Sequence, residues 1–170
     1  MRLRNPSSAT PFLAGTFAGT VATLFHTAAM FALQPWLPRE SHRRLPPAQI
    51  TSTAARRTRT GQVESGRGLR VATAFTHFGF GAAAGSLYPL LAEHGRSKPV
   101  ATGIGFGVAV WAASYLGWIP ALRLLPPATQ HSAQRNAMMI LAHVAWGAAL
   151  GLMYDRMRHD RPASAHGERS

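Results

Sequence analysis

Residues Val100–Leu122, VATGIGFGVAVWAASYLGWIPAL, form the stretch that decides the fold of this chain. The stretch has 23 residues, and none of them is charged. A helix of that length is about 35 Å long at ~1.5 Å per residue, which exceeds the ~30 Å hydrocarbon core of a bilayer. The stretch therefore predicts a transmembrane helix.

Three further stretches without charge extend this prediction to the rest of the chain. All 18 Lys and Arg residues and all 6 Asp and Glu residues lie outside the four stretches. A soluble bundle would carry charge on the outer face of each helix, whereas these helices are apolar on every side. We therefore predict one integral membrane domain over residues 1–170, which is all-α and forms a bundle of four transmembrane helices. The three further stretches are Pro11–Gln34, Val71–Ala92 and Ala137–Tyr154.

The formal net charge of +12 arises in the loops and tails. Because the basic residues have no aromatic residues interleaved with them, we expect them to contact lipid headgroups rather than nucleic acid. Pro46-Pro47 favours a short helix through Ala48–Arg57, and the composition of Thr58–Arg70 favours a mobile segment. The chain has no cysteine, which excludes disulfides and thiolate metal sites.

An internal similarity relates the two halves of the chain. HFGFGAAAGSLY (His77–Tyr88) and HVAWGAALGLMY (His143–Tyr154) both fit the pattern H-x-x-[FW]-G-A-A-x-G-x-[LM]-Y. A Leu-Pro-Pro-Ala segment precedes each of them in the loop before the helix. We therefore predict two tandem two-helix repeats, related by a pseudo-twofold axis along the membrane normal. The repeats cover residues 11–92 and 100–157, and residues 158–170 are expected to form a disordered tail.

Small residues mark one face of each predicted helix. Glycines spaced as G-x-x-x-G let two membrane helices approach closely, so we expect these faces to pack against one another. The same faces would also serve association between copies, and a homo-oligomer is therefore one alternative. The predicted packing residues are Gly15, Gly19, Gly81, Gly85, Gly103, Gly107, Gly147 and Gly151.

Three histidines and one serine fall at a similar depth in the four stretches. His77 and His143 each lie six residues into their stretch, which is about 9 Å along a helix. His26 lies eight residues before Gln34, and Ser114 lies eight residues before Leu122. Because each histidine also lies on the small-residue face of its helix, we predict one polar layer of His26, His77, His143 and Ser114 inside the bundle.

Several roles are open to this layer. It could relay protons or a substrate, because ionisable groups inside membranes often mark pathways. It could hold a metal through three imidazoles, or a haem between His77 and His143. The simplest structural interpretation is that neutral imidazoles donate hydrogen bonds that hold the helices together.

The uncharged stretches contain no Asp or Glu that could act as a general base, so we expect no enzyme activity. We assign no catalytic and no metal-ligating residue, and the sequence identifies no cofactor. The leading hypothesis is a small transport or permeation-type protein. The alternatives are a structural or assembly protein that associates through its GxxxG faces, and a haem- or metal-binding membrane protein.

The sequence also predicts where three aromatic residues and two arginines lie relative to the membrane. Trp111, Tyr115 and Trp118 are expected to face lipid or the interface as belt aromatics. Arg123 and Arg135 flank the histidine layer, where they could attract an anion, and we favour interfacial side chains that extend toward the headgroups.

The segments Trp111–Gln130 and Arg135–Leu152 carry a resemblance to a known family, together with His77–Tyr88 and Leu45–Thr51. Through them the chain resembles the YagU-like proteins, a bacterial inner-membrane family of unknown function. The resemblance covers most of residues 11–154. It implies a multi-pass protein of the bacterial inner (cytoplasmic) membrane, and it implies no catalytic residues.

Overall fold

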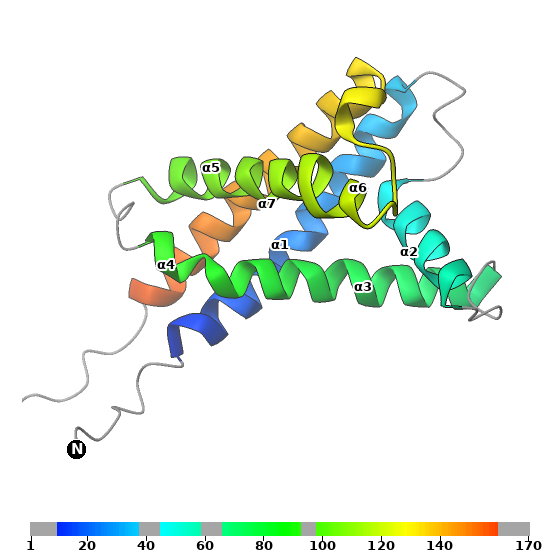
Figure 1. The fold of residues 1–170 in the computed structure, drawn as a ribbon. Helices are drawn as coiled ribbons and strands as arrows, with labels where there is room; N and C mark the ends of the chain where they lie inside the picture. The colour runs from blue at the N-terminus through cyan, green and yellow to red at the C-terminus, as the bar shows by residue number, and fades with distance from the viewer. Residues whose placement is uncertain (1–9, 38–44, 59–65, 93–97, 160–170) are drawn as a thin grey trace, which may run out of the picture.

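A computed structural model describes residues 10–37, 45–58, 66–92 and 98–159, and every regular element in these ranges is helical (Figure 1). The all-α prediction is therefore confirmed for this part of the chain. The long helices are α1 (Thr10–Leu33), α3 (Gly66–Leu87), α5 (Pro99–Ala112) and α7 (Ala133–His159). The shorter elements are η2 (Gln34–Trp36), α2 (Pro46–Arg57), α4 (Pro89–Ala92), the π-helical segment η5 (Ala113–Trp118), α6 (Ile119–Ala121) and η6 (Ala128–Gln130).

Three helical segments are long and apolar enough to cross a membrane, which identifies a multi-pass membrane protein. They are Thr10–Trp36, Pro99–Ala121 and Ala133–His159. Helix α3 is not among them, because it begins with Arg67 and Arg70 and ends before the predicted stretch does. The fourth span therefore stays a prediction.

The predicted second helix, Val71–Ala92, is interrupted at Tyr88. Pro89 has no N–H to donate to the carbonyl of Gly85, and the N–H of Tyr88 donates to that carbonyl instead, at 3.1 Å. The chain then forms α4 after this turn. The uncharged part of the unbroken helix is consequently limited to residues 71–87.

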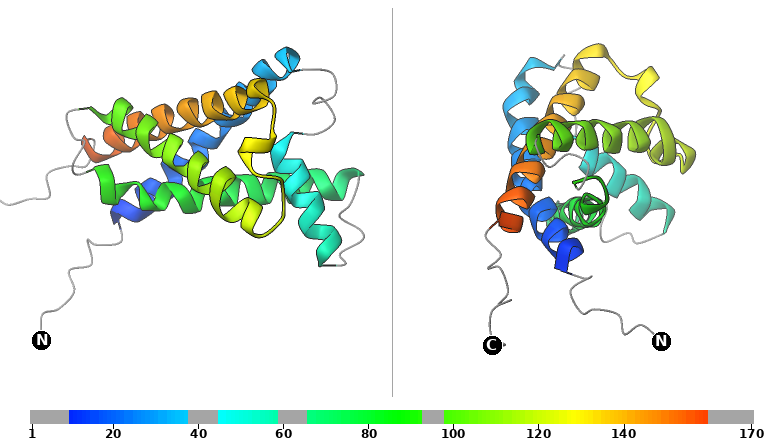
Figure 2. Two further views of the ribbon diagram at one scale, coloured as in Figure 1. Left: turned by 45° about the horizontal axis from the view of Figure 1, so that its top comes forward. Right: turned by 90° about the vertical axis from the view of Figure 1, so that its left-hand side faces the viewer.

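The long helices follow one another in space in the order α3, α1, α7, α5. Helix α1 packs against both α3 and α7, and α5 packs against α7. Helices α3 and α5 have no comparable contact, and Figures 1 and 2 show them on the two sides of the crossing between α1 and α7. This arrangement leaves a space between α3 and α5.

Glycine sets the distance within each helix pair. Gly15 and Gly19 of α1 lie against Gly85 and Gly81 of α3, and a Cβ on Gly19 would come 2.8 Å from the Cα of Gly85. Real Cβ atoms do not approach other atoms so closely. The pairs can therefore form only while these positions carry no side chain.

The second pair has the same kind of contact. Gly103 of α5 lies against Gly147 and Gly151 of α7, and Gly107 lies against His143 and Gly147. A Cβ on Gly147 would come 2.8 Å from the carbonyl carbon of Gly103. The backbones of α5 and α7 therefore touch directly.

Aromatic rings fill the bundle at the end where α1 begins and α7 ends. The rings of Tyr88 and Tyr154 meet edge to face with their centroids 5.5 Å apart. Phe106 lies 5.5 Å from Tyr88 and 5.9 Å from Trp146, measured between ring centroids. These four rings form an aromatic column, Tyr154–Tyr88–Phe106–Trp146, along the inside of the bundle.

The boundaries of several predicted helices and segments differ from those in the structure. The short helix predicted after Pro46-Pro47 is confirmed as α2. Residues 66–70 of the segment predicted to be mobile belong to α3, and residues 59–65 lie outside the described residues. Helix α7 begins at Ala133 and continues to His159, so Arg135 is helical and the predicted tail lies outside the described residues only from residue 160.

We expect Gly147→Ala to lower the free energy of unfolding by about 1–3 kcal/mol, because the added methyl group would overlap the backbone of α5. Gly105→Ala is the matched control in the same helix pair, since its Cβ would meet no atom within 4 Å. We expect that control to be neutral or mildly stabilising. Unfolding by SDS in mixed micelles, followed by circular dichroism, measures both variants, and equal destabilisation would contradict the contact.

Candidate functional site

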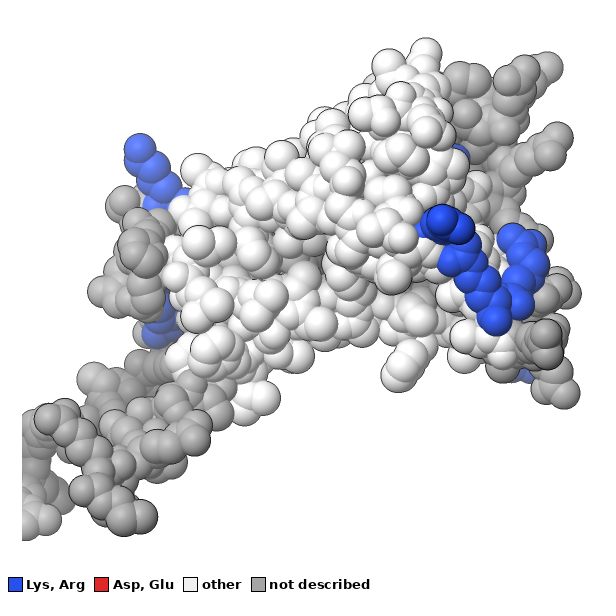
Figure 3. Space-filling view, in the orientation of Figure 1, with Lys and Arg blue, Asp and Glu red and all other residues white. Residues whose placement is uncertain are grey.

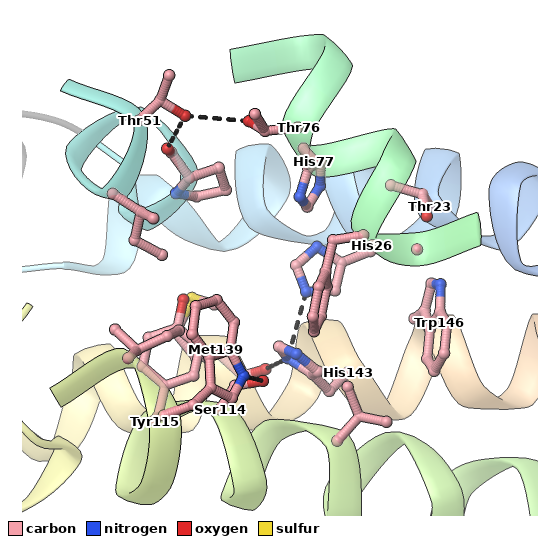
Figure 4. Close-up of a pocket in the computed structure, with 17 residues that line it drawn as sticks. Thr23, His26, Thr51, Thr76, His77, Ser114, Tyr115, Met139, His143 and Trp146 are labelled. Atoms are coloured by element: carbon pink, nitrogen blue, oxygen red, sulfur yellow. Dashed lines mark hydrogen bonds between the residues drawn. The ribbon is translucent and has the colours of Figure 1, made fainter. Parts of the chain in front are cut away.

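Three histidines from three helices meet inside the bundle, as the sequence predicts. Nε2 of His26 on α1 lies 3.2 Å from Nδ1 of His143 on α7. The ring centroid of His26 lies 4.6 Å from that of His143 and 5.1 Å from that of His77 on α3. Figure 4 shows His26 between the other two rings.

The hydrogen bonds of His143 determine where its proton lies. Nδ1 of His143 is 2.8 Å from the carbonyl oxygen of Met139, which can only accept a hydrogen bond. The proton of neutral His143 must therefore be on Nδ1. That single N–H also faces Nε2 of His26, so Nε2 of His26 is the acceptor and the proton of neutral His26 is on its Nδ1.

Two ring nitrogens of this cluster have no hydrogen-bond partner among the described residues. They are Nδ1 of His26 and Nε2 of His77. His26 is only 5% exposed, so the N–H assigned to its Nδ1 has no protein acceptor and little access to solvent. Figure 4 shows the free nitrogen of His26 turned toward His77. A buried unpaired polar group costs about 1–3 kcal/mol. A bound molecule that forms hydrogen bonds with these nitrogens would remove that cost.

The cluster borders a cavity of about 290 Å³. Ser114 lies on its wall together with all three histidines, so the structure brings the four predicted polar residues to one space. The residues that line the cavity include no Asp, Glu, Lys or Arg, so the histidines are its only groups that could be charged near neutral pH. The lining residues are Thr23, His26, Pro47, Ile50, Thr51, Thr76, His77, Phe80, Gly81, Val110, Ser114, Tyr115, Trp118, Ile119, Met139, His143 and Trp146.

The π-helical segment η5 supplies one wall of this cavity. Ser114 and Tyr115 are buried, and Nε1 of Trp118 donates a hydrogen bond to Oγ of Ser114 at 3.2 Å. The ring of Tyr115 lies 6.2 Å from that of His143, measured between centroids. The prediction that Tyr115 faces lipid is therefore wrong, because the turn of η5 directs this ring inward.

Helix α2 covers one end of the cavity. The hydroxyl groups of Thr51 on α2 and Thr76 on α3 are 3.1 Å apart, in hydrogen-bond contact. Arg57, at the end of α2, donates to the carbonyl oxygens of Leu122 and Arg123, the latter at 2.8 Å. Helix α2 is thus joined both to α3 and to the segment that follows α6.

Arg135 differs from its predicted role at the interface. Its side chain is buried, and its guanidinium donates to Oε1 of Gln49 on α2 at 2.7 Å. Burial, and next the positive charge of Arg135, lower the pKa of His131, so this ring adds no charge at neutral pH. Arg135 therefore helps to fix α2 over the cavity instead of extending toward headgroups.

The described residues contain no group of three His, Cys, Asp or Glu side chains that could hold a metal ion. A haem between His77 and His143 would also have to displace the ring of His26, which lies between them (Figure 4).

Pattern reasoning missed the residues contributed by the short elements. Pro47, Ile50 and Thr51 reach the cavity because α2 folds back over it, and no period in the sequence signals that return. Trp146 was also missed, although it lies three residues after His143. Its Nε1 donates to the carbonyl oxygen of Gly19 at 3.2 Å, which joins α7 to α1 below the histidines.

A model of a protein family described as a protein of unknown function (DUF1440) matches residues 30–152. The matched region contains His77, His143 and Ser114, and it begins four residues after His26. No curated protein and no solved structure matches the chain.

We expect His143→Leu to lower the free energy of unfolding by about 1 kcal/mol, because it removes the hydrogen bond that joins α7 to α1. His77→Leu is the matched comparison, since Nε2 of His77 has no partner to lose among the described residues. Because this variant removes a buried unpaired nitrogen, we expect it to leave the free energy of unfolding unchanged or to raise it by up to about 1–3 kcal/mol. SDS unfolding measures both variants, and a larger loss in His77→Leu would contradict the assignment of partners.

Proposed function

The chain belongs to the DUF1440 family, whose function is unknown, and on that premise we propose that its function resides in the histidine-lined cavity. The protein binds a small molecule there, inside the membrane, and acts in the transport or permeation of that molecule. The layer of His26, His77, His143 and Ser114 provides the polar contacts for the ligand.

One observation carries this proposal. His26 and His77 line a cavity of about 290 Å³, and Nδ1 of His26 and Nε2 of His77 have no partner among the described residues. Histidines that only hold helices together would use such nitrogens on a neighbouring helix, as Nδ1 of His143 does. A volume of this size lies at the lower end of the ~300–1,000 Å³ typical of small-molecule sites.

The assembly hypothesis has less support. The eight predicted packing glycines lie in contacts between helices of the same chain. A surface already filled by α1 and α3, or by α5 and α7, is not free to bind a second copy. A role through GxxxG association between copies is therefore the weaker proposal.

We also propose the architecture of four spans in two tandem repeats, over residues 11–92 and 100–157. Similar glycine contacts within the α1–α3 and α5–α7 pairs support it, as do the two Leu-Pro-Pro-Ala segments, which lead into α2 and η6. The tyrosines that end the repeated motif, Tyr88 and Tyr154, pack against each other. Figure 3 adds that on the face it shows the described Lys and Arg lie toward the two ends of the molecule, with an uncharged region between them that includes the middle of α3.

The bacterial inner membrane is the proposed location, on the basis of the resemblance to YagU-like proteins. We propose a non-enzymatic role, since the cavity is lined by no carboxylate that could serve as a general base. The lipid bilayer is the surrounding partner, because large apolar side chains cover the outer faces of the helices.

Cysteine labelling tests whether the cavity is an open polar site. The chain contains no cysteine, so Ser114→Cys introduces a single thiol at the cavity wall. Methyl methanethiosulfonate is small and uncharged, and it reacts with a thiolate, which forms only in polar surroundings. We expect Ser114→Cys in lipid vesicles to react at least tenfold faster than the control.

Ala113→Cys is that control, because residue 113 is next to Ser114 and exposed on the outside of the helix bundle. Its thiol would face lipid and stay protonated. Labelling is read by mass spectrometry of the intact protein. Equal and slow reaction of both thiols would show that Ser114 is in packed protein, which would remove the proposed binding site.

A further inference from the structure

The mouth of the histidine cavity is defined by the few lining residues that are exposed. Most residues on the wall are buried, including His26, His143 and Ser114. The exposed ones are Thr76 and Phe80 on α3 and Trp118 at the end of η5. The cavity therefore opens between α3 and η5, where the long helices leave a space.

Two aromatic side chains stand at this mouth. Phe80 is 40% exposed and Trp118 is 39% exposed, and their ring centroids are 5.8 Å apart. Their contact bridges two helices that have little other packing between them. A bridge of two side chains can open by rotamer changes alone, without moving a helix.

The mouth faces the part of the surface that would contact lipid. Large apolar side chains are exposed on the outer faces of α3 and η5, with Phe75 81% exposed and Leu116 51% exposed. Figure 3, in the orientation of Figure 1, shows no Lys or Arg on the middle of the face formed by α3 and α5. A molecule that reaches this mouth comes from the hydrocarbon region rather than from water.

Packed elements cover the other sides of the cavity, except where Pro47 and His77 also line a second cavity of about 440 Å³ between α1, α2 and α3. Helix α2 covers one end and is joined to α3 through Thr51 and Thr76. The aromatic column from Trp146 to Tyr154 fills the bundle toward the opposite end. Helices α1 and α7 cross behind the histidines.

The chemistry of the wall restricts the ligand. No Asp, Glu, Lys or Arg lines the cavity, so an ion would lose its hydration without gaining a counter-charge. The N–H assigned to Nδ1 of His26 can donate a hydrogen bond to an acceptor such as a carbonyl or hydroxyl oxygen. A cavity of about 150 Å³ accepts benzene, so about 290 Å³ accommodates a substituted two-ring aromatic group.

We propose that the cavity takes its ligand sideways from the bilayer, through the portal between Phe80 and Trp118. The ligand is an uncharged, lipid-dissolved molecule with a ring that carries carbonyl or hydroxyl oxygen. That oxygen pairs with the imidazoles of His26 and His77, while any attached apolar chain remains in the lipid. This inference rests on the proposed small-molecule function and specifies its ligand class and route.

Three probes of one shape test the ligand class. 2-Methyl-1,4-naphthoquinone is uncharged and has two carbonyl oxygens, and 2-methylnaphthalene has the same ring system without them. 1,4-Naphthoquinone-2-sulfonate has the carbonyls and a charge that keeps it in water. The chain has no cysteine for the quinones to modify.

The fluorescence of Trp146 reports binding, because this side chain lines the cavity and is only 4% exposed. A variant with Trp36→Phe, Trp111→Phe and Trp118→Phe retains Trp146 alone and keeps a ring at the portal. In lipid nanodiscs we expect saturable quenching by 2-methyl-1,4-naphthoquinone. The sulfonate should give no saturable quenching, and 2-methylnaphthalene should compete at least tenfold more weakly.

Variants in the same background separate the site from the portal. His77→Phe should weaken binding of the quinone at least tenfold, because it removes a pairing nitrogen and keeps a ring of similar size. Phe80→Ala should speed the onset of quenching several-fold in stopped-flow experiments. Phe75→Ala, on the lipid-facing side of α3, should leave both the affinity and the rate unchanged.

Each contrary result overturns a defined part of the proposal. Saturable quenching by the sulfonate would show access from water, and equal binding of 2-methylnaphthalene would show that the oxygen is not recognised. If quenching by the quinone never saturates while Ser114→Cys still reacts with the methanethiosulfonate, the ligand class is wrong and the cavity function stands. If both experiments fail, the proposed function fails with them.

Discussion

Direct contact between helix backbones is the constraint on which the rest of this structure depends. At Gly19 and Gly85, and again at Gly103 and Gly147, two helices touch at distances that no side chain would permit. In a membrane the association of helices depends on such close packing, because lipid is as apolar as the side chains it replaces. The glycine contacts fix each pair, and the register of each pair fixes the height of its histidines.

The two pairs join asymmetrically, and this asymmetry produces the cavity. Helix α1 packs against α7, and Trp146 of α7 donates a hydrogen bond to the carbonyl oxygen of Gly19 on α1. Helices α3 and α5 have no comparable contact; the rings of Phe80 and Trp118 meet on this side, and Tyr88, which follows α3, contacts Phe106 of α5. A fully symmetric bundle would have filled this space with helix, whereas here α2 and the π-helical segment η5 form its walls.

The histidine cluster is polar in an apolar setting, and its hydrogen bonds are incomplete. Nε2 of His26 and Nδ1 of His143 form the hydrogen bond that joins α1 to α7, and Nδ1 of His143 also donates to the carbonyl oxygen of Met139 within α7. The remaining nitrogens of His26 and His77 contribute nothing to helix packing in the described structure. Groups of this kind inside a membrane protein are expensive to maintain, which is why they indicate a role beyond stability.

The sequence by itself determined that this is an all-helical, multi-pass membrane protein, because charge is confined to the segments between long apolar stretches. It also determined that His26, His77 and His143 share one height, because helical rise converts residue spacing into depth. It did not determine that Tyr115 turns inward or that Arg135 is buried beneath α2. Those outcomes depend on how helices far apart in the chain pack against one another, and only the tertiary structure decided them. The cavity and its mouth between Phe80 and Trp118 were decided at the same level, because they exist only where α3 and α5 fail to meet.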